Sequence, residues 1–221
     1  MDRLYSQFVQ RGDLVFDVGA HVGDRVASFR RLGARVIAIE PQPAFAKVLR
    51  LFYGRSRDVV VEAMAVGRAA GSTCIMINPD NPTVSTVSQD FVSAARNAPG
   101  WETQRWTKSL IVPVTTLDAL IGRHGIPSFI KIDVEGFEAE ALQGLSHPVK
   151  ALSFEFTTIQ RAIALACIDR CVALGLSRFN AALGESQSLV HPGWIDSAAI
   201  GRWLTALPHE ANSGDIYAAV A

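Results

Sequence analysis

The stretch Val15-Phe16-Asp17-Val18-Gly19-Ala20-His21-Val22-Gly23 decides the fold. It starts within a short apolar run, Leu14–Val18, turns at a glycine, and leads into Gly23–Leu32, whose apolar residues recur at helical spacing. A strand, a tight turn and a helix in this order begin a βαβ unit. Gly19 permits the tight turn because glycine has no Cβ, and Gly23 lets the helix and a ligand come close. The turn therefore offers backbone N–H groups to a ligand.

The same alternation of strands and helices continues along the chain. Further core strands are predicted at Arg35–Ile39, Val59–Val61, Phe129–Ile132 and Leu152–Phe156, and helices at Pro43–Tyr53, Phe137–Leu145 and Ile159–Leu174. The C-terminal part adds a strand near Ser177–Ala182, a helix near Asp196–Leu204 and a strand at Ile216–Val220. Alternation at this spacing indicates an α/β protein with a doubly wound, mostly parallel sheet. Helices on both faces make it a three-layer sandwich, which fits the continuously apolar run Val36–Ile39.

The domain organisation is predicted to be simple. No linker or composition shift divides residues 1–221, and this length suits one hydrophobic core. Between expected strands at Ser72–Ile77 and Leu110–Val114 lies a polar segment, residues 78–108, with a short helix near Gln89–Asn97. A loop of this length is usually functional or mobile. We expect the segment to be a lid over the ligand site, to which its two tryptophans could contribute.

The composition excludes several functions. Lys plus Arg (21) balances Asp plus Glu (21), so no basic field favours nucleic acid or an anionic membrane. No apolar run reaches the ~18 residues of a membrane-spanning helix, and the mixed charges of Met1–Gln7 argue against a secretory signal. We expect a cytoplasmic protein whose Cys167 and Cys171 are core residues, and no Cys/His array has zinc spacing. The oligomeric state is not indicated.

Two acidic residues favour one nucleotide-like ligand over another. Glu40 ends the second predicted strand, where its carboxylate can accept both ribose hydroxyls of a nucleoside. A dinucleotide site would carry G-x-G-x-x-G, but only Gly19 and Gly23 are present, in G-x-x-x-G spacing. Asp17 would repel a pyrophosphate and attract a ligand with an ammonium and a sulfonium. The charges therefore favour S-adenosylmethionine, although a plain strand–helix connection and a solvated Glu40 are the alternatives.

The ordered motifs resemble those of the FkbM family of methyltransferases. The Ile-Lys-Ile-Asp-Val-Glu-Gly-Phe-Glu block is the most specific of them, and the matches cover nearly the whole chain. They occur at 15–23, at Ile39-Glu40-Pro41, at Ala65-Val66-Gly67, at Val112–Leu117, at Ile130–Glu138 and at Gly214-Asp215-Ile216-Tyr217.

This resemblance implies a Rossmann-like class I methyltransferase fold, S-adenosylmethionine as methyl donor, and usually a hydroxyl as acceptor. It also implies that Asp17, Gly19 and Gly23 line the methionine end, that Glu40 takes the ribose, and that Ala65 lies near the adenine. The candidate donor-binding residues are Asp17, Gly19, Ala20, His21, Gly23, Glu40, Pro41 and Ala65.

The chain departs from the family at two points. The family commonly has Asn where this chain has His21, which leaves the contact of this residue with the methionine moiety open. His21 could act as a base, but a histidine in such a turn is more often a hydrogen-bonding or packing group. The segment before the first strand is also shorter than in many members, and a shorter cap would leave the site more open.

Three carboxylates are candidates for the chemistry, in the order Asp133, Glu135 and Glu155. They follow or interrupt neighbouring parallel strands, so they should converge at the edge that carries Gly19 and Glu40. One of them could accept the acceptor's hydroxyl proton. Glu155 interrupts the apolar run Leu-Ser-Phe-Glu-Phe, which predicts a nearby pairing partner.

Each carboxylate also has another interpretation. Two together could hold Mg²⁺ and lower the pKa of an acceptor hydroxyl, but we expect no metal because the sequence shows no pattern of supporting ligands. Asp133 could instead cap the helix Phe137–Leu145, and Glu135 could interact with its dipole.

The sequence therefore predicts an enzyme that methylates a hydroxyl of a small molecule or sugar. The alternatives are an N- or C-methyltransferase, a nucleotide-dependent oxidoreductase, and a module that binds the cofactor without turnover.

Overall fold

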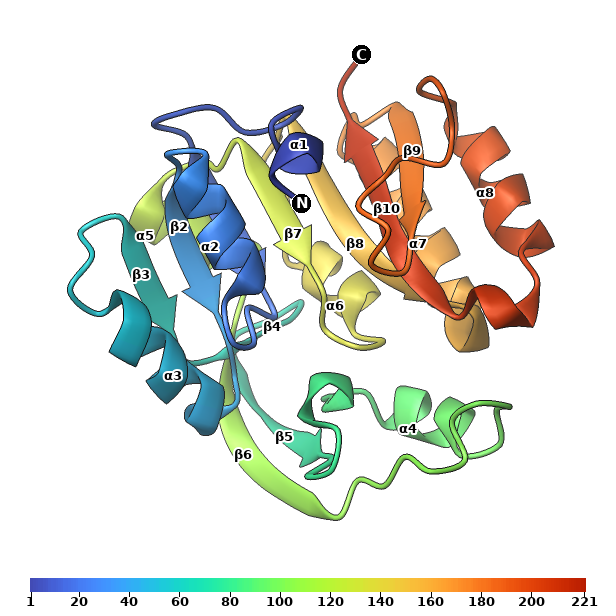
Figure 1. Ribbon diagram of the computed structural model, residues 1–221, viewed down its shortest axis with the longest axis horizontal. Coiled ribbons are helices and arrows are strands. Elements are labelled where there is room, and N and C mark those ends of the chain that lie inside the picture. The colour runs from blue at the N-terminus through green and yellow to red at the C-terminus, as the bar shows by residue number, and fades with distance from the viewer.

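A seven-stranded sheet forms the centre of the molecule (Figure 1). The computed structural model describes residues 1–221. The strands of this sheet are β1 (Leu14–Val18), β2 (Arg35–Ile39), β3 (Val59–Glu62), β7 (Phe129–Ile132), β8 (Ala151–Thr157), β9 (Arg178–Leu183) and β10 (Ser213–Ala219). They lie in the order β3-β2-β1-β7-β8-β10-β9. All neighbouring pairs are parallel except the two that β10 makes with β8 and β9, so the prediction of a mostly parallel sheet is confirmed.

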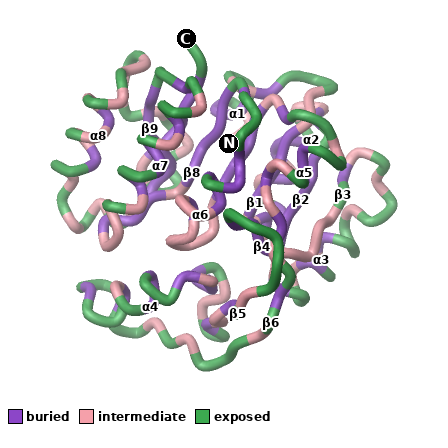
Figure 2. The backbone as a smooth tube through the Cα atoms, turned by 180° about the vertical axis from the view of Figure 1, so that it is seen from behind, coloured by how far each residue is buried: buried purple, intermediate pink, exposed green.

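Helices cover both faces of the sheet and complete the predicted three-layer sandwich. One face packs against α1 (Asp2–Tyr5), α2 (Asp24–Arg31) and α3 (Pro43–Tyr53). The other face packs against α5 (Leu117–His124), α6 (Glu138–Gln143), α7 (Arg161–Ala173) and α8 (Ser197–Ala206), seen from behind in Figure 2. Both faces of the central strands are covered, which is why these strands are almost entirely buried.

The register of the strands places a set of charged residues on the α2 face. Asp17 of β1 lies opposite Lys131 of β7, and Asp215 of β10 lies opposite Glu155 of β8. Residues two apart on a strand share a face, so Asp133 follows Lys131 on the same side. The neighbouring positions of β1 and β7 point to the opposite, apolar face. The charges therefore collect on one face, at the end of the sheet where β1 and β7 finish.

A second, three-stranded sheet was not foreseen from the sequence. It contains β4 (Ala65–Val66), β5 (Gly71–Ile77) and β6 (Lys108–Thr115), in the order β4-β6-β5. The expected strands at 72–77 and 110–114 are present, but the sequence did not show that they pair with each other. Between them lie a 3₁₀ turn, Pro82–Val84, and α4 (Gln89–Ala95), which Figure 1 shows beyond the ends of β7 and β8.

Polar side chains begin several of the helices. Ser88, Thr116 and Asp196 accept hydrogen bonds from the backbone N–H groups of the first turns of α4, α5 and α8. The predicted helix Ile159–Leu174 opens as a 3₁₀ turn, and its α-helical part starts only at Arg161. None of the helices combines the length and apolar character that a membrane crossing requires.

Candidate active site at the carboxyl edge of the sheet

The main cavity lies where the strand order reverses, between β1 and β7, which is where open α/β sheets bind ligands. Its volume is about 280 Å³. Its lining includes every candidate residue named from the sequence except Gly23. The structure therefore brings together Asp17, Gly19, Ala20, His21, Glu40, Pro41, Ala65, Asp133, Glu135 and Glu155.

Gly19 and Gly23 serve different purposes in the turn. Both adopt positive φ angles, +85° and +96°. A Cβ on Gly19 would lie 1.7 Å from the carbonyl oxygen of Asp133, so only glycine lets the turn pass the end of β7. A Cβ on Gly23 would instead meet Leu49 of α3 at 2.8 Å. Gly23 lies outside the cavity lining, and its lack of a side chain is needed where α2 approaches α3.

The backbone N–H groups of the turn are mostly used within the protein. Those of Gly19 and Ala20 donate to the carbonyl oxygen of Ile39, and that of Gly23 donates to Ala20. The N–H of His21 donates to Glu40 at 2.9 Å. This corrects the expectation that the turn presents N–H groups to a ligand. A pyrophosphate needs such free donors, so the structure disfavours a dinucleotide here.

Asp17 carries a carboxylate oxygen without a partner. The residue belongs to β1 rather than to the turn, it is fully buried, and its Oδ2 makes no hydrogen bond. Burial raises the pKa of Asp17 to about 6, although Lys131 and Arg25 pull it down. A buried acceptor without a partner is costly, and a cationic group in the cavity would satisfy it. The side chain thus fits the ammonium or sulfonium of S-adenosylmethionine.

Glu40 is held rigidly at the end of β2. Its two carboxylate oxygens accept hydrogen bonds from the backbone N–H groups of Gln42 at 2.8 Å and His21 at 2.9 Å. Burial raises the pKa of Glu40 to about 7, against these two hydrogen bonds. Each carboxylate oxygen keeps a further lone pair, so ribose hydroxyls can still donate to it.

His21 is a packing residue in this structure. Its φ of +47° is left-handed, a conformation that Asn adopts more readily than His. The imidazole packs against Phe45 with 4.0 Å between ring centroids, and its buried Nε2 has no partner. Burial lowers the pKa of His21, so the ring is neutral near pH 7.

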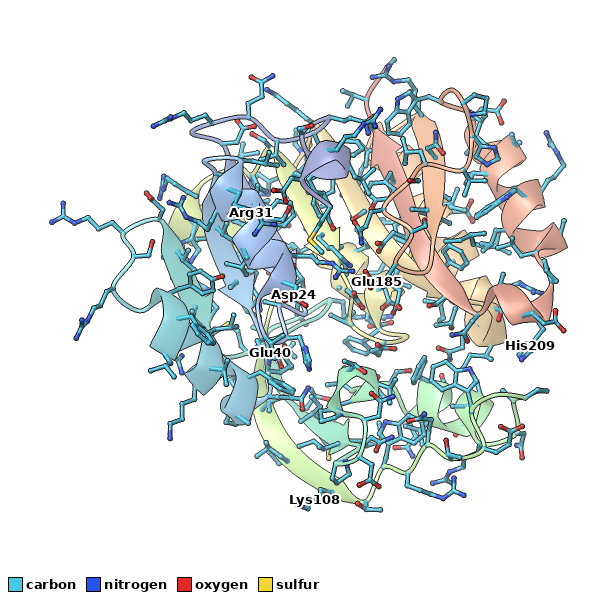
Figure 3. The ribbon with its side chains drawn as sticks, in the orientation of Figure 1. Asp24, Arg31, Glu40, Lys108, Glu185 and His209 are labelled. Atoms are coloured by element: carbon cyan, nitrogen blue, oxygen red, sulfur yellow. The ribbon has the colours of Figure 1, made fainter.

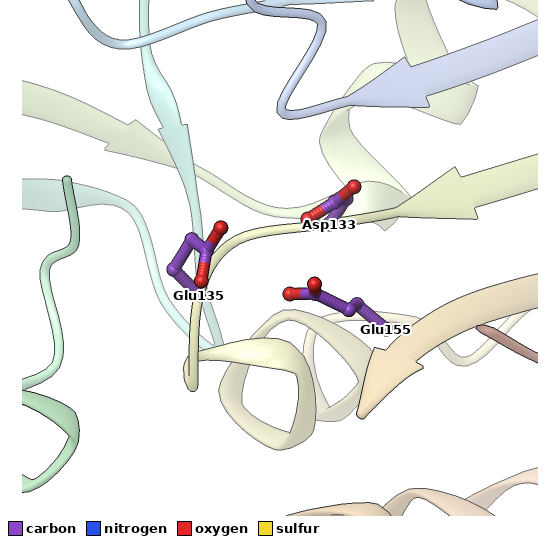
Figure 4. A group of neighbouring side chains, drawn as sticks. All are labelled: Asp133, Glu135 and Glu155. Atoms are coloured by element: carbon purple, nitrogen blue, oxygen red, sulfur yellow. The ribbon is translucent and has the colours of Figure 1, made fainter. Parts of the chain in front are cut away.

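The three candidate catalytic carboxylates converge as predicted. Asp133, Glu135 and Glu155 each place a carboxylate oxygen within 4.8 Å of the others (Figure 4). Glu135 has a left-handed φ of +55°, an uncommon conformation for a side chain of this size. Burial and the Asp133 charge raise the pKa of both Glu135 and Glu155 well above the usual range. The trio therefore carries less negative charge near neutral pH than its composition suggests.

Lys131 is the functional residue that the sequence reasoning missed. Its fully buried ammonium lies 2.8 Å from Asp133 Oδ2 and 3.2 Å from Asp215 Oδ1. Burial alone would raise the pKa of Asp133, but Lys131 holds it below its ordinary value. The signal was available, because Lys131 interrupts an apolar strand in the same way as Glu155 interrupts β8.

The pairing partner expected for Glu155 is Asp133, because a hydrogen bond from Glu155 helps to lower the pKa of the Asp133 carboxyl while burial favours the protonated form of Glu155. Lys131 pairs with Asp133 and Asp215 instead. Asp133 does not cap α6. Glu138, the first residue of α6, accepts hydrogen bonds from the N–H groups of Val134 and Gly136 in the loop before the helix, and no side chain caps α6. An acidic cluster alone does not define a metal site, and we assign no metal to it.

The segment between β5 and β6 directly contacts the loop that follows β7. The hydroxyl of Thr86 donates to the carbonyl oxygen of Glu135 at 2.6 Å. The two tryptophans, in contrast, pack with Phe91 in a small separate core and do not line the cavity. Cavity contacts from this segment come from Thr83, Ser85, Thr86 and Val87.

The chain resembles several methyltransferases. It is 24% identical over 176 residues to the hexuronic acid methyltransferase AglP of Haloferax volcanii, a match that covers 73% of this chain and 62% of that protein. Among solved structures, a TehB-like S-adenosylmethionine-dependent methyltransferase of Corynebacterium glutamicum is 11% identical, with a TM-score of 0.48 and coverage of 100% and 86%. A precorrin-6y C5,15-methyltransferase of Geobacter metallireducens is also 11% identical, with a TM-score of 0.46 and coverage of 99% and 86%. These two likenesses are too distant to inform function.

A family model also matches this chain. Residues 17–165, more than half of the chain, match the methyltransferase FkbM domain. The matched range begins at Asp17 and includes Glu40, Asp133 and Glu155, all of which line the cavity. The family implies S-adenosylmethionine as methyl donor, and the unpartnered Asp17 fits a donor of that charge. The chain belongs to the FkbM family of methyltransferases.

Proposed function

We propose that this protein transfers a methyl group from S-adenosylmethionine to a hydroxyl of a small molecule or sugar. The observation that carries the proposal is the cavity in which the unpartnered Asp17 lies beside the Asp133–Lys131 pair. A sugar-like acceptor is supported by the relative whose name states hexuronic acid methylation. That relative is only 24% identical, and this chain spans 62% of its length.

The donor half of the cavity consists of β1, β2 and the residues that follow them. Asp17 would face the positive charge of the donor, and Glu40 would accept the ribose hydroxyls. Gly19, Ala20, His21 and Pro41 would form the wall around them, and Ala65 of β4 would lie against the adenine. When bound, S-adenosylmethionine supplies a methyl group on a positively charged sulfur.

The acceptor half consists of the ends of β7 and β8. Asp133, kept ionised by Lys131, would accept the proton of the attacking hydroxyl. Glu135 and Glu155, whose burial favours the protonated form, would orient the acceptor by hydrogen bonds. Positioning supplies much of the rate enhancement when the donor is already activated.

We further propose that residues 1–221 act as one methyltransferase domain in which residues 78–108 form a lid. Thr83, Ser85, Thr86 and Val87 support this role because they line the cavity. The small core of Phe91 and the tryptophans would give the lid its own shape.

Methyl transfer to an acceptor panel tests the proposal. Methyl-labelled S-adenosylmethionine would be incubated with matched sugars, simple alcohols and amines, and the products would be analysed by mass spectrometry. We expect label on a hydroxyl oxygen, with sugars preferred. Label on nitrogen or carbon would replace the O-methyltransferase assignment, and donor binding without any transfer would indicate a binding module.

A further inference from the structure

Arg25 crosses the cavity from the first turn of α2 to the loop that follows β9. Its Nη2 donates to both carboxylate oxygens of Glu185, at 2.7 and 2.9 Å. Figure 3 shows Glu185 beside the start of α2, which the labelled Asp24 marks. Both Arg25 and Glu185 line the cavity. A pair separated by 160 residues in sequence thus joins the donor half of the cavity to the C-terminal part of the sheet.

The Arg25 guanidinium has unused hydrogen-bonding capacity. The side chain is only 18% exposed, its buried Nε has no partner, and its Nη1 makes no hydrogen bond. A guanidinium offers five N–H donors in a planar fork that matches a carboxylate. Buried donors without acceptors are costly, which indicates that a second oxyanion completes this site.

A ligand can displace the Glu185 carboxylate from Arg25. Its side chain is 72% exposed, so it returns to water at little cost when it leaves Arg25. An ion pair with a solvent-exposed carboxylate is weak, so a ligand carboxylate held inside the cavity would compete with Glu185 for Arg25. The Glu185 carboxylate therefore marks the position where a carboxylate meets Arg25.

We propose that Arg25 is the carboxylate-binding residue of this cavity and that Glu185 occupies it until a ligand carboxylate takes its place. The inference rests on the proposed function, whose methyl donor carries an α-amino acid group. Asp17 favours the donor as the source, since its unpartnered oxygen lines the same cavity and would pair with the donor's ammonium. A uronic acid acceptor would be the other source of a carboxylate.

Calorimetric titrations of the full chain distinguish the two sources. S-adenosylhomocysteine carries the amino acid group, whereas 5′-methylthioadenosine lacks it. If the donor is the source, Arg25→Met should weaken S-adenosylhomocysteine about 10- to 100-fold and change methylthioadenosine less than about 2-fold. Arg25→Lys should weaken the binding of S-adenosylhomocysteine less than Arg25→Met does, because lysine keeps the positive charge but lacks the planar fork of N–H donors.

The acceptor experiment titrates glucuronic acid and glucose into the protein with S-adenosylhomocysteine present. If the acceptor is the source, Arg25→Met should abolish the preference for glucuronic acid over glucose and leave S-adenosylhomocysteine affinity unchanged. If Arg25→Met alters neither ligand, the proposal is overturned. Failure of the wild type to bind S-adenosylhomocysteine would instead refute the proposed function.

Glu185→Gln keeps the test informative if Arg25→Met folds poorly, which circular dichroism would reveal. Glutamine has no charge to compete for Arg25, so the carboxylate ligand should bind about 2- to 10-fold more tightly. Weaker binding would show that Glu185 helps to hold the ligand, and would contradict the exchange.

Discussion

The two halves of the cavity satisfy their polar groups in opposite ways. In the donor half, the turn after β1 uses its N–H groups internally, and Glu40 accepts two of the protein's own hydrogen bonds. In the acceptor half, three carboxylates crowd together around one pair that involves Lys131. The donor half still leaves Asp17 and His21 with unpartnered buried atoms, whereas the acceptor half holds carboxylates whose pKa values are shifted in opposite directions.

The largest expected effect comes from removing the base in the acceptor half. Asp133→Asn should lower kcat about 10²- to 10⁴-fold because no carboxylate is left to accept the hydroxyl proton. Affinity for S-adenosylhomocysteine should change less than about 2-fold, since the donor half remains intact. Steady-state kinetics and calorimetry measure the two quantities. Full activity of the variant would remove Asp133 from the mechanism.

The next largest effect concerns the ion pairs that Lys131 forms with Asp133 and Asp215. Lys131→Met should lower the free energy of unfolding by about 3–5 kcal/mol, because Asp133 and Asp215 are left without their buried cation. Lys108, an exposed lysine at the start of β6, provides the matched control, and Lys108→Met should change stability by less than about 0.5 kcal/mol. Urea unfolding at pH 7 compares them. Equal stability of the two variants would mean that Lys131 is not a structural partner of these carboxylates.

A pH-dependent effect tests the unmet charge in the donor half. The pKa of Asp17 is about 6 in the folded protein, above its usual value of 3.8, so folding favours its protonated form. Between these pH values the folded state binds the proton more tightly, and stability falls as the pH rises. By pH 8 the penalty is on the order of 1–3 kcal/mol, which Asp17→Asn should remove.

Urea unfolding of wild type and Asp17→Asn at pH 4 and pH 8 measures this penalty. The variant should gain stability relative to the wild type mainly at pH 8. A gain of equal size at both pH values would show that the buried charge is not the cause.

The smallest effect concerns the contact between the proposed lid and the acceptor half. Thr86→Val removes the hydroxyl that donates to the Glu135 carbonyl, and should lower kcat about 3- to 10-fold with little change in KM. Thr86→Ser keeps the hydroxyl and should retain most of the activity. A larger loss in Thr86→Ser than in Thr86→Val, which keeps the methyl group, would point to packing by that methyl group instead.

The sequence predicted the position of those candidate residues that depend only on the strand that carries or precedes them. Asp17, Glu40 and Asp133 each follow from one strand and the residues just after it, and the sheet brings such ends together. Long-range pairing was not visible in this way. The second partner of Lys131 is Asp215, 84 residues away, and the partner of Arg25 is Glu185, 160 residues away.

Local reasoning also misplaced some groups whose surroundings were unknown. The sequence did not show that α3 packs closely against Gly23. The N–H groups of the turn look free until Ile39 and Glu40 are seen to accept them. The sheet of β4, β5 and β6 stayed hidden because its pairing depends on contacts across residues 78–107. In each case a partner distant in sequence decided the outcome.

The central claim is that the donor half accepts a cationic, phosphate-free nucleoside through Asp17. Isothermal titration of wild type and Asp17→Asn with S-adenosylmethionine and with NAD⁺ tests it most directly. We predict that the wild type binds S-adenosylmethionine, that Asp17→Asn weakens this binding about 10-fold or more, and that neither protein binds NAD⁺. Binding of NAD⁺ by the wild type, or an unchanged S-adenosylmethionine affinity in Asp17→Asn, would contradict the claim.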